Sequence, residues 1–481
     1  MPSRVVRVRS ADDGVAAESL REGVAQIQAE LKVSAEFPAS VEQAAAKAAA
    51  SPRLPDLDRT DLPFVTIDPA SAMDLDQALH IERDADGYLV HYAIADLAAF
   101  ITPGDPVDLE AHRRGETLYG ADSKIPLHPK VISEDAGSLL PDQVRPALVW
   151  TIAVDATGEA TSVTVERALV RSRAKLSYDE VQTALDAGTA DEVFTLLGEV
   201  GRLRMAKEAE RGGVSLPLPE QEIDISGDRW TLEFRSLHPV EQWNAQISLL
   251  TGMGAASLMV GARVGLLRTL PPADPRDVRR LRRTARALNV DWPDGVDYPS
   301  FIRSLDPTRP NHAAMVVACT RLLRGSGYVG FDGEVPEQHL HSAIAGAYAH
   351  VTAPLRRLVD RYALEICVAI CSGEPAPQWV LDNLGELPKT MQESGRRANQ
   401  YENAVLDLVE AAALAPRVGE TFDAVVVDVD DKDDRHGDLT VQEPAIEARV
   451  SSEQPLPLGE PVNVTLSVAD PATRKVEFTL P

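Results

Sequence analysis

Residues 66–80, TIDPASAMDLDQALH, concentrate acidic side chains that could hold a metal ion. Asp68, Asp74 and Asp76 follow the pattern D-x-x-x-x-x-D-x-D. Residues two apart point to the same face of an extended segment, so Asp74 and Asp76 should share a face. Carboxylates brought together repel one another, and burying them without a partner is costly. A divalent cation such as magnesium, which prefers oxygen ligands, would offset that cost. A solvated acidic turn is the other interpretation of this spacing.

The composition limits the class of protein. The chain has 481 residues, of which 44% are hydrophobic, and a formal net charge of −26. This length predicts about two to four domains, one of which can be a large catalytic unit. The acidic charge argues against a general nucleic-acid binder, because phosphate contacts need local positive charge. It is compatible with an enzyme that has a basic channel inside an acidic shell.

The cysteines and the apolar segments indicate the compartment. The three cysteines, Cys319, Cys367 and Cys371, do not suggest a disulfide scaffold. Cys367 and Cys371 lie in an apolar helical run, ALEICVAIC, where helix core is favoured over a metal site. The N-terminal segment has no apolar signal region, and no uninterrupted apolar run reaches transmembrane length. We therefore expect a soluble cytoplasmic protein without membrane contact. A monomer is the default expectation.

The order of elements predicts an α+β fold. A strand is expected at residues 5–9, and helices near 15–31 and 41–49. Alternating strands follow the acidic segment, and Ser177 with Glu180 is typical of a helix N-cap. Five short strands after residue 418 predict a small closed barrel of the oligonucleotide-binding type. The predicted domains are a helical segment at 1–55, a catalytic domain at 56–415 and the barrel at 418–481.

Two motifs resemble those of a known family. FVTIDPASAMDLDQAL resembles the sequence I-D-x-x-x-x-x-D-x-D-D-A, which opens the catalytic domain of the ribonuclease II (RNB) exoribonucleases. Gln77 stands where that family has a fourth carboxylate. Residues 352–360, TAPLRRLVD, resemble the family's T-S-P-I-R-R-Y-x-D, with Ala353 and Leu358 in place of Ser and Tyr. The resemblance covers roughly residues 56–415 and the barrel. It implies mixed sheets surrounded by helices. Many relatives carry N-terminal cold-shock domains, which we do not expect here, because the residues before the acidic segment are too few for a pair of five-stranded barrels.

The resemblance implies roles for individual residues. Asp68, Asp74, Asp76 and Gln77 would bind the metal, and Asp76 would be the indispensable acid. Arg356 would bind the scissile or an adjacent phosphate, because arginine offers a planar fork of donors to phosphate oxygens. The other implied RNA contacts are Tyr119, Tyr178, Leu218, Glu241, Arg357 and Glu402.

Each of these residues also has a simpler interpretation. Tyr119 and Tyr178 could be core aromatics, and Glu241 could cap a helix. Glu402 could belong to an ordinary amphipathic helix. Leu218 stands where relatives often have an aromatic residue that stacks on a base, so that platform would be missing. A structural pair is expected between Arg357 and Asp360, and a structural role is expected for Asp96.

Residues 263–286 form the densest basic run of this acidic chain. A solvated helix face and a surface that guides RNA are both compatible with it. The run consists of Arg263, Arg268, Arg276, Arg279, Arg280, Arg282, Arg283 and Arg286.

The implied activity is magnesium-dependent hydrolysis of single-stranded RNA from the 3′ end, releasing nucleoside 5′-monophosphates. Gln77 keeps a carbonyl oxygen but lacks a charge, so weaker metal binding and rescue by manganese are expected. The alternative is a catalytically weakened or silent RNA-binding protein, indicated by Gln77, Leu218, Ala353 and Leu358. A metal-dependent phosphatase acting on small nucleotides is a third interpretation.

Overall fold

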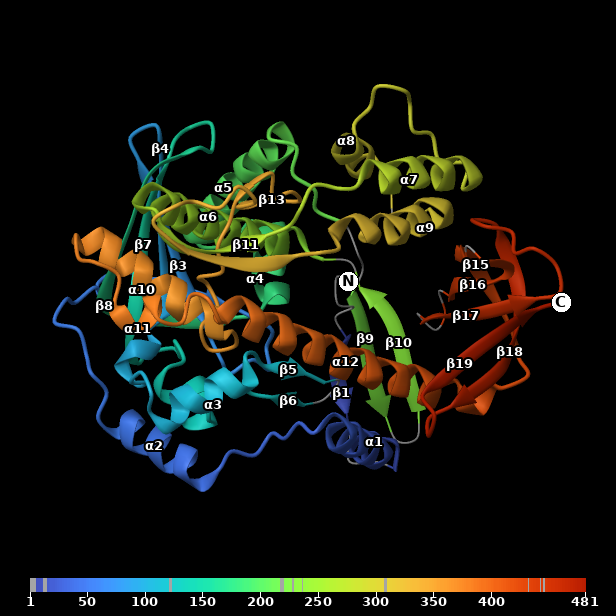
Figure 1. The fold of residues 1–481 in the computed structure, drawn as a ribbon, viewed down its shortest axis with the longest axis horizontal. Coiled ribbons are helices and arrows are strands. Elements are labelled where there is room, and N and C mark those ends of the chain that lie inside the picture. The colour runs from blue at the N-terminus through green and yellow to red at the C-terminus, as the bar shows by residue number, and fades with distance from the viewer. Residues whose placement is uncertain are drawn as a thin grey trace.

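Two closed five-stranded barrels, several smaller sheets and the helices around them make up the described part of the protein (Figure 1). The computed structural model describes residues 6–11, 15–120, 123–216, 220–226, 229–235, 237–306, 309–430, 432–441, 443 and 446–481. In the view of Figure 1 the first barrel lies at the left and the second at the right, with helix α12 (Leu387–Leu414) running between them. The α+β fold predicted from the sequence is confirmed.

The first barrel has the strand order β2-β3-β4-β7-β8. Long antiparallel hairpins form most of it, and a parallel pairing of β2 with β8 closes it. Its strands are β2 (Phe64–Ile67), β3 (Gln77–Asp84), β4 (Gly87–Ala95), β7 (Val144–Val154) and β8 (Ala160–Leu176). Because β2 ends and β3 begins at the same end of the barrel, the acidic segment between them lies at its mouth.

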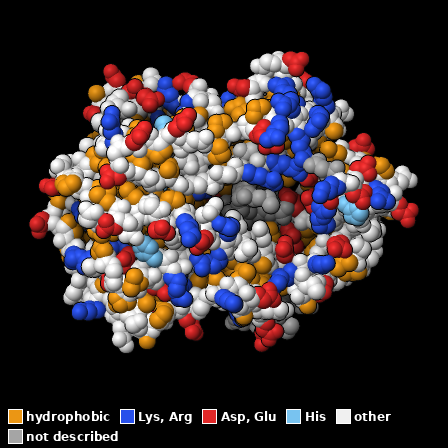
Figure 2. All heavy atoms as spheres, viewed as in Figure 1, with side chains coloured by type: hydrophobic (Ala, Val, Ile, Leu, Met, Phe, Trp, Pro, Cys, Tyr) orange, Lys and Arg blue, Asp and Glu red, His pale blue; other side chains and the backbone are white. Residues whose placement is uncertain are grey.

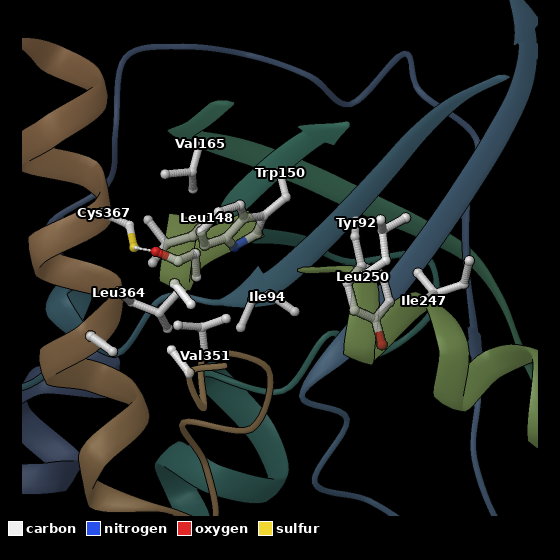
Figure 3. Packing of buried hydrophobic residues seen from close by; sticks show 14 of the residues in the cluster. Tyr92, Ile94, Leu148, Trp150, Val165, Ile247, Leu250, Val351, Leu364 and Cys367 are labelled. Atoms are coloured by element: carbon white, nitrogen blue, oxygen red, sulfur yellow. Dashed lines mark hydrogen bonds between the residues drawn. The ribbon is translucent and has the colours of Figure 1, made fainter. Parts of the chain in front are cut away.

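The main core joins this barrel to two helices. Trp150 of β7 and Tyr92 of β4 are almost completely buried. Figure 3 shows them packed with Ile247 and Leu250 of α6 (Pro239–Ala262) and with Leu364 of α10 (Leu358–Ser372). Among the described residues, only α6 has the length and composition to cross a membrane, but half of its most apolar window is buried. It is a core helix of this protein.

Cys367 is also part of this core, as the sequence predicted. It lies on α10 beside Trp150 and Val165, and its side chain is fully buried (Figure 3).

The second barrel has the order β15-β16-β17-β19-β18, which confirms the five C-terminal strands predicted from the sequence. Phe422 and Phe478 meet edge to face in its core. Its strands are β15 (Thr421–Asp430), β16 (Asp433–Val441), β17 (Ile446–Ser452), β18 (Pro461–Asp470) and β19 (Lys475–Leu480).

The N-terminal segment packs into the body of the protein. Strand β1 (Val6–Ala11) pairs in parallel with β9 (Glu220–Ser226), which is hairpin-paired with β10 (Arg229–Arg235). Apolar residues of α1 (Val15–Leu31) share a buried cluster with residues of α12. The predicted strand and helices are therefore present, while the proposed domain boundaries stay a prediction.

The remaining elements lie around the first barrel, except that α7 (Pro275–Ala287), α8 (Tyr298–Arg303) and α9 (Pro310–Cys319) share a separate buried cluster with Val427 of β15 in the second barrel. The other helices are α2 (Ala39–Ala50), α3 (Pro106–Arg114), α4 (Tyr178–Asp186), α5 (Glu192–Glu210) and α11 (Gln378–Leu381). The short strands are β5 (Leu118–Tyr119), β6 (Lys124–Ile125), β11 (Val264–Thr269), β12 (Gly327–Asp332), β13 (Leu340–His341) and β14 (Gly346–Ala347). Helix α4 begins at the predicted capping box of Ser177 and Glu180.

Candidate active site

The acidic segment is fixed by its backbone and by one buried apolar side chain. Leu75 is fully buried; its N–H donates to the Ser138 hydroxyl over 2.9 Å, and its carbonyl accepts the N–H of Leu139 over 3.0 Å. The carbonyl of Asp76 accepts the N–H of Ala95 over 2.9 Å. These bonds hold the backbone of Leu75 in place, and Asp74 and Asp76 are its two neighbours in the sequence. Asp68 directly follows the last residue of β2.

Asp76 is an enclosed acid at the mouth of the barrel. Its side chain is 6% exposed, and its Oδ1 accepts the N–H of Leu355 over 2.8 Å. The Nε of Arg356 lies 3.4 Å from its Oδ2. Burial raises the pKa of Asp76 to about 8, although Arg356 and the Leu355 N–H lower it. The carboxylate is therefore held at a site where its charge is incompletely compensated.

The two arginines of the second motif differ in their surroundings. Arg357 donates to both carboxylate oxygens of Asp360 over 2.9 Å, and Asp360 also accepts the N–H of Ala353 over 2.7 Å. The expected structural pair is therefore confirmed. The side chain of Arg356 is 44% exposed, so its guanidinium is accessible to an anion beside Asp76.

Gln77 uses both ends of its amide within the protein. Its Oε1 accepts the Tyr92 hydroxyl over 2.6 Å, and its Nε2 donates to the carbonyl of Thr352. The Tyr92 hydroxyl also lies 2.9 Å from that of Ser248. A carboxylate at position 77 could not donate to Thr352. Gln77 thus connects β3 to the loop that carries Arg356, and its role as a metal ligand stays a prediction.

Lys124 is a residue of the site that the sequence did not reveal. Its Nζ lies 2.6 Å from Oδ1 of Asp74 and 3.1 Å from Oε1 of Glu134. Lys124 belongs to β6, where it pairs with Tyr119 of β5. No motif or periodicity marks this lysine, because the β5–β6 hairpin brings it to Asp74 only in the folded chain.

The predicted tyrosines lie at different parts of the mouth. Tyr119 is 40% exposed, and its hydroxyl interacts with Arg356. The N–H of Tyr119 donates to the carboxylate of Glu402 on α12, and burial together with nearby Glu116 raises the pKa of Glu402 to about 7. Tyr178 is the first residue of α4, and its hydroxyl accepts the amide of Asn244 over 3.1 Å.

Glu241 and Asp96 have structural partners. Glu241 completes a capping box at the start of α6 and pairs with Arg235 through two bonds of 2.8 Å. Burial favours its neutral form, but Arg235 and the His238 N–H lower the pKa of Glu241 overall. Asp96 caps a short helical turn and pairs with Arg167 over 2.9 Å, as its expected structural role requires. Leu218, also predicted as an RNA contact, lies outside the described residues.

The donor set fits a divalent cation in chemistry. In the part of the chain that the structure describes, no group of three His, Cys, Asp or Glu side chains converges as a metal site. The candidate ligands are carboxylate and amide oxygens, which hard cations prefer. The buried Asp76 carboxylate has a raised pKa, and a cation beside it would stabilise its charged form.

The basic run of the sequence is divided among several elements. Arg263 ends α6 in a left-handed conformation, and Arg268 lies on β11 over the ring of Tyr328. The remaining arginines belong to α7, where five of them line a hollow of about 480 Å³: Arg276, Arg279, Arg282, Arg283 and Arg286. Figure 2 shows these side chains as a basic patch at the upper right of an otherwise mixed surface.

Three of the α7 arginines are accessible to a ligand. Arg276 pairs with Asp274, and Arg282 donates to Val296 and lies over Trp292. Arg279, Arg283 and Arg286 are exposed and make no ion pair with the described residues. We call these three residues the α7 patch.

The mouth of the first barrel holds an enclosed acid beside an exposed arginine, and a second barrel of the oligonucleotide-binding type follows it in the chain. This arrangement is suited to binding a phosphate-containing polymer. The comparisons with known proteins agree with a protein that binds such a polymer. The chain belongs to the RNB domain family, whose profile matches residues 57–372. Residues 420–480 match the RNase II-type exonuclease C-terminal S1 domain.

The relatives are longer proteins. Ribonuclease R of Escherichia coli (strain K12) is 27% identical over 402 residues, which are 78% of this chain and 48% of the relative. The chain thus spans about half the length of this curated relative. The human exosome complex exonuclease RRP44 is 27% identical over 320 residues, which are 63% of this chain and 33% of the relative.

Solved structures share the fold. Mycoplasma genitalium RNase R in complex with ribose-methylated single-stranded RNA has a TM-score of 0.85 at 20% identity, over 96% of this chain and 78% of that one. Yeast Ssd1, described as a pseudonuclease, has a TM-score of 0.70 at 15% identity, over 90% of this chain and 55% of that one. At these identities the likeness shows the fold alone.

Proposed function

We propose that this protein is a divalent-metal-dependent 3′→5′ exoribonuclease that hydrolyses single-stranded RNA and releases nucleoside 5′-monophosphates. The observation that carries the proposal is the pairing of enclosed Asp76 with exposed Arg356, 3.4 Å apart, at the mouth of an RNB barrel. Family membership supports a nuclease. It also supports the metal requirement, since RNB exoribonucleases generally depend on divalent metals. We also propose a monomer in the cytoplasm.

The residues of the site have separate tasks in this proposal. Arg356 binds the scissile phosphate and offsets the charge that develops on its oxygens. A water oxygen attacks phosphorus and gives up a proton, the bond between phosphorus and the 3′ oxygen of the preceding nucleotide breaks, and that 3′ oxygen takes up a proton. Magnesium, or manganese in its place, would be held by Asp68, Asp74, Asp76 and Gln77; when bound it polarises the phosphate and lowers the pKa of water.

The RNA chain has candidate contacts on both sides of this centre. The exposed ring of Tyr119 is suited to pack against the terminal base, a contact worth about 1–3 kcal/mol per base. Tyr178, Glu241, Arg357, Glu402 and Leu218 remain predicted contacts. The ribose 2′-hydroxyl is the group that would distinguish RNA from DNA.

The α7 patch supports a guiding role for positive charge away from the reacting phosphate. Each phosphate contact to a single strand adds about 0.7 to the slope of log K against log salt concentration. We expect Arg283→Ser to lower this slope by about 0.7 in RNA-binding titrations. Arg435→Ser removes the same charge from a residue paired with Asp433 in the second barrel and should leave the slope unchanged.

The proposed reaction is tested through its products. Wild-type protein is incubated with uniformly labelled single-stranded RNA and magnesium, and the products are separated by chromatography. Nucleoside 5′-monophosphates, formed faster from a long chain than from a dinucleotide, support the exonuclease. Inorganic phosphate released at a rate independent of chain length indicates the phosphatase and contradicts the proposal.

A silent or weakened RNA-binding protein is the second candidate function. Specific observations favour it: Gln77 has both ends of its amide engaged, and Asp74 is paired with Lys124. In this case RNA binding is retained while no product forms with magnesium or manganese. Recovery of activity in Gln77→Asp would show that the missing carboxylate caused the silence.

A further inference from the structure

Lys124 is located where a metal ion would compete with it. Its ammonium lies 2.6 Å from Asp74 and 3.1 Å from Glu134, and the three side chains are between 14% and 22% exposed. Pairing of β5 with β6 fixes the backbone of Lys124 opposite Tyr119. We call Asp74, Asp76 and Glu134 the acidic centre. Lys124 is held in a defined position in this centre and is not a freely moving surface cation.

The charges around the centre make this placement significant. Asp74 and Asp76 interact electrostatically, and Arg356 compensates part of the charge of Asp76. Position 77 contributes no charge, because it is glutamine. Lys124 neutralises a further negative charge at Asp74. A second divalent ion at Asp74 would have to displace the ammonium and would find fewer negative ligands, and ligand charge largely sets affinity for hard cations.

We propose that Lys124 is a resident monovalent cation of the acidic centre, which replaces a second divalent ion at Asp74 and limits the protein to one bound divalent cation. This inference deepens the proposed function and rests on it for its catalytic meaning. Lys124 is a positioning residue in this account: it acts through Asp74, whose carboxylate it holds in an ion pair. A merely structural ion pair would instead leave the capacity for metal unchanged.

Manganese binding to the metal-free full-length chain tests this proposal. Free and bound manganese are counted by electron paramagnetic resonance, with melting temperature as a check of folding. We expect wild-type protein to bind one ion. Lys124→Met, which removes the charge at similar length, should bind two ions.

Two further variants make the result specific. Lys130→Met removes an exposed lysine that lies 4.0 Å from the same Glu134, so it should behave as wild type. If Lys124→Met does not fold, Lys124→Gln serves instead, since an amide can still hydrogen-bond to Asp74 or Glu134 without charge. Two manganese ions on wild-type protein, or a single ion on the folded Lys124 variants, would overturn the proposal.

The outcome is independent of RNA hydrolysis. A protein that hydrolyses no RNA but gains a manganese ion in Lys124→Met contradicts the proposed function and supports the role of Lys124. A protein that degrades RNA while its Lys124 variants bind one ion of unchanged affinity supports the proposed function and contradicts the role of Lys124.

Discussion

The two barrels of this chain share their topology class but differ in how their charges are satisfied. Each is closed and five-stranded, with an apolar interior. In the second barrel, Arg449 pairs with Asp430 over 2.6 Å and with Asp438 over 3.1 Å, all three at the surface. At the mouth of the first, Asp76 is enclosed and its pKa is raised to about 8.

This difference indicates where chemistry is to be expected. A barrel is a scaffold, and function depends on the side chains it carries. Enclosed acids with shifted pKa values are typical of functional sites. Exposed ion pairs contribute little to stability. The second barrel's only phenylalanines, Phe422 and Phe478, are buried in its core, where they cannot stack on bases. We therefore propose that the reaction takes place at the first barrel.

The largest effect is expected at Asp76. Asp76→Asn keeps an oxygen for the Leu355 N–H but removes the charge, so the rate of RNA shortening should fall on the order of a thousandfold, about 4 kcal/mol. Asp438→Asn makes the same change in the second barrel and should leave the rate unchanged. Equal losses in the two variants would remove the distinction between the barrels.

The paired arginines should separate catalysis from stability. Arg356→Gln should lower the rate about hundredfold with little change in the free energy of unfolding. Arg357→Gln leaves the fully buried Asp360 without its partner and should destabilise the protein by about 3–5 kcal/mol. Rate assays and urea denaturation measure the two effects. A large loss of stability in Arg356→Gln would count against its assignment to phosphate.

The second barrel should respond to mutation through its packing. Phe478 is 1% exposed and contacts Phe422 with ring centroids 5.6 Å apart. Phe478→Ala should destabilise this barrel by about 3 kcal/mol, measured by chemical denaturation. Hydrolysis of a short oligonucleotide should be unaffected while the barrel is still folded. Loss of that hydrolysis at full folding would give the second barrel a direct part in the reaction.

The smallest effect concerns Glu402 and pH. Its folded pKa of about 7 lies above the ordinary 4.5, so the folded state holds the proton more tightly. Stability from this group is present at low pH and is lost as pH rises from about 4.5 to 7. Glu402→Gln should remove this loss and be about 1 kcal/mol more stable than wild type at pH 8, but not at pH 4. Thermal melts across this range, with Glu393→Gln on the same helix as control, measure the difference.

The sequence predicted what depends on local pattern. The Ser177 cap, the Arg357–Asp360 pair and the five C-terminal strands follow from capping rules, motifs and alternation, and they are confirmed. The metal and phosphate roles of the acids and of Arg356 stay predictions. It did not predict contacts made only by tertiary structure. Lys124 reaches Asp74 through a short hairpin, and the amide of Gln77 meets groups from β4 and from the Thr352 loop. The basic run was treated as one segment, because spacing in the sequence cannot show that Arg268 belongs to a strand and the later arginines to helix α7.

The most direct test of the central claim is a time course with 5′-labelled single-stranded RNA in magnesium, in manganese and in chelator. The account predicts a ladder that shortens from the 3′ end with either metal and stops in chelator. Intact RNA under every metal condition, at protein concentrations that bind it, would contradict hydrolysis at the first barrel.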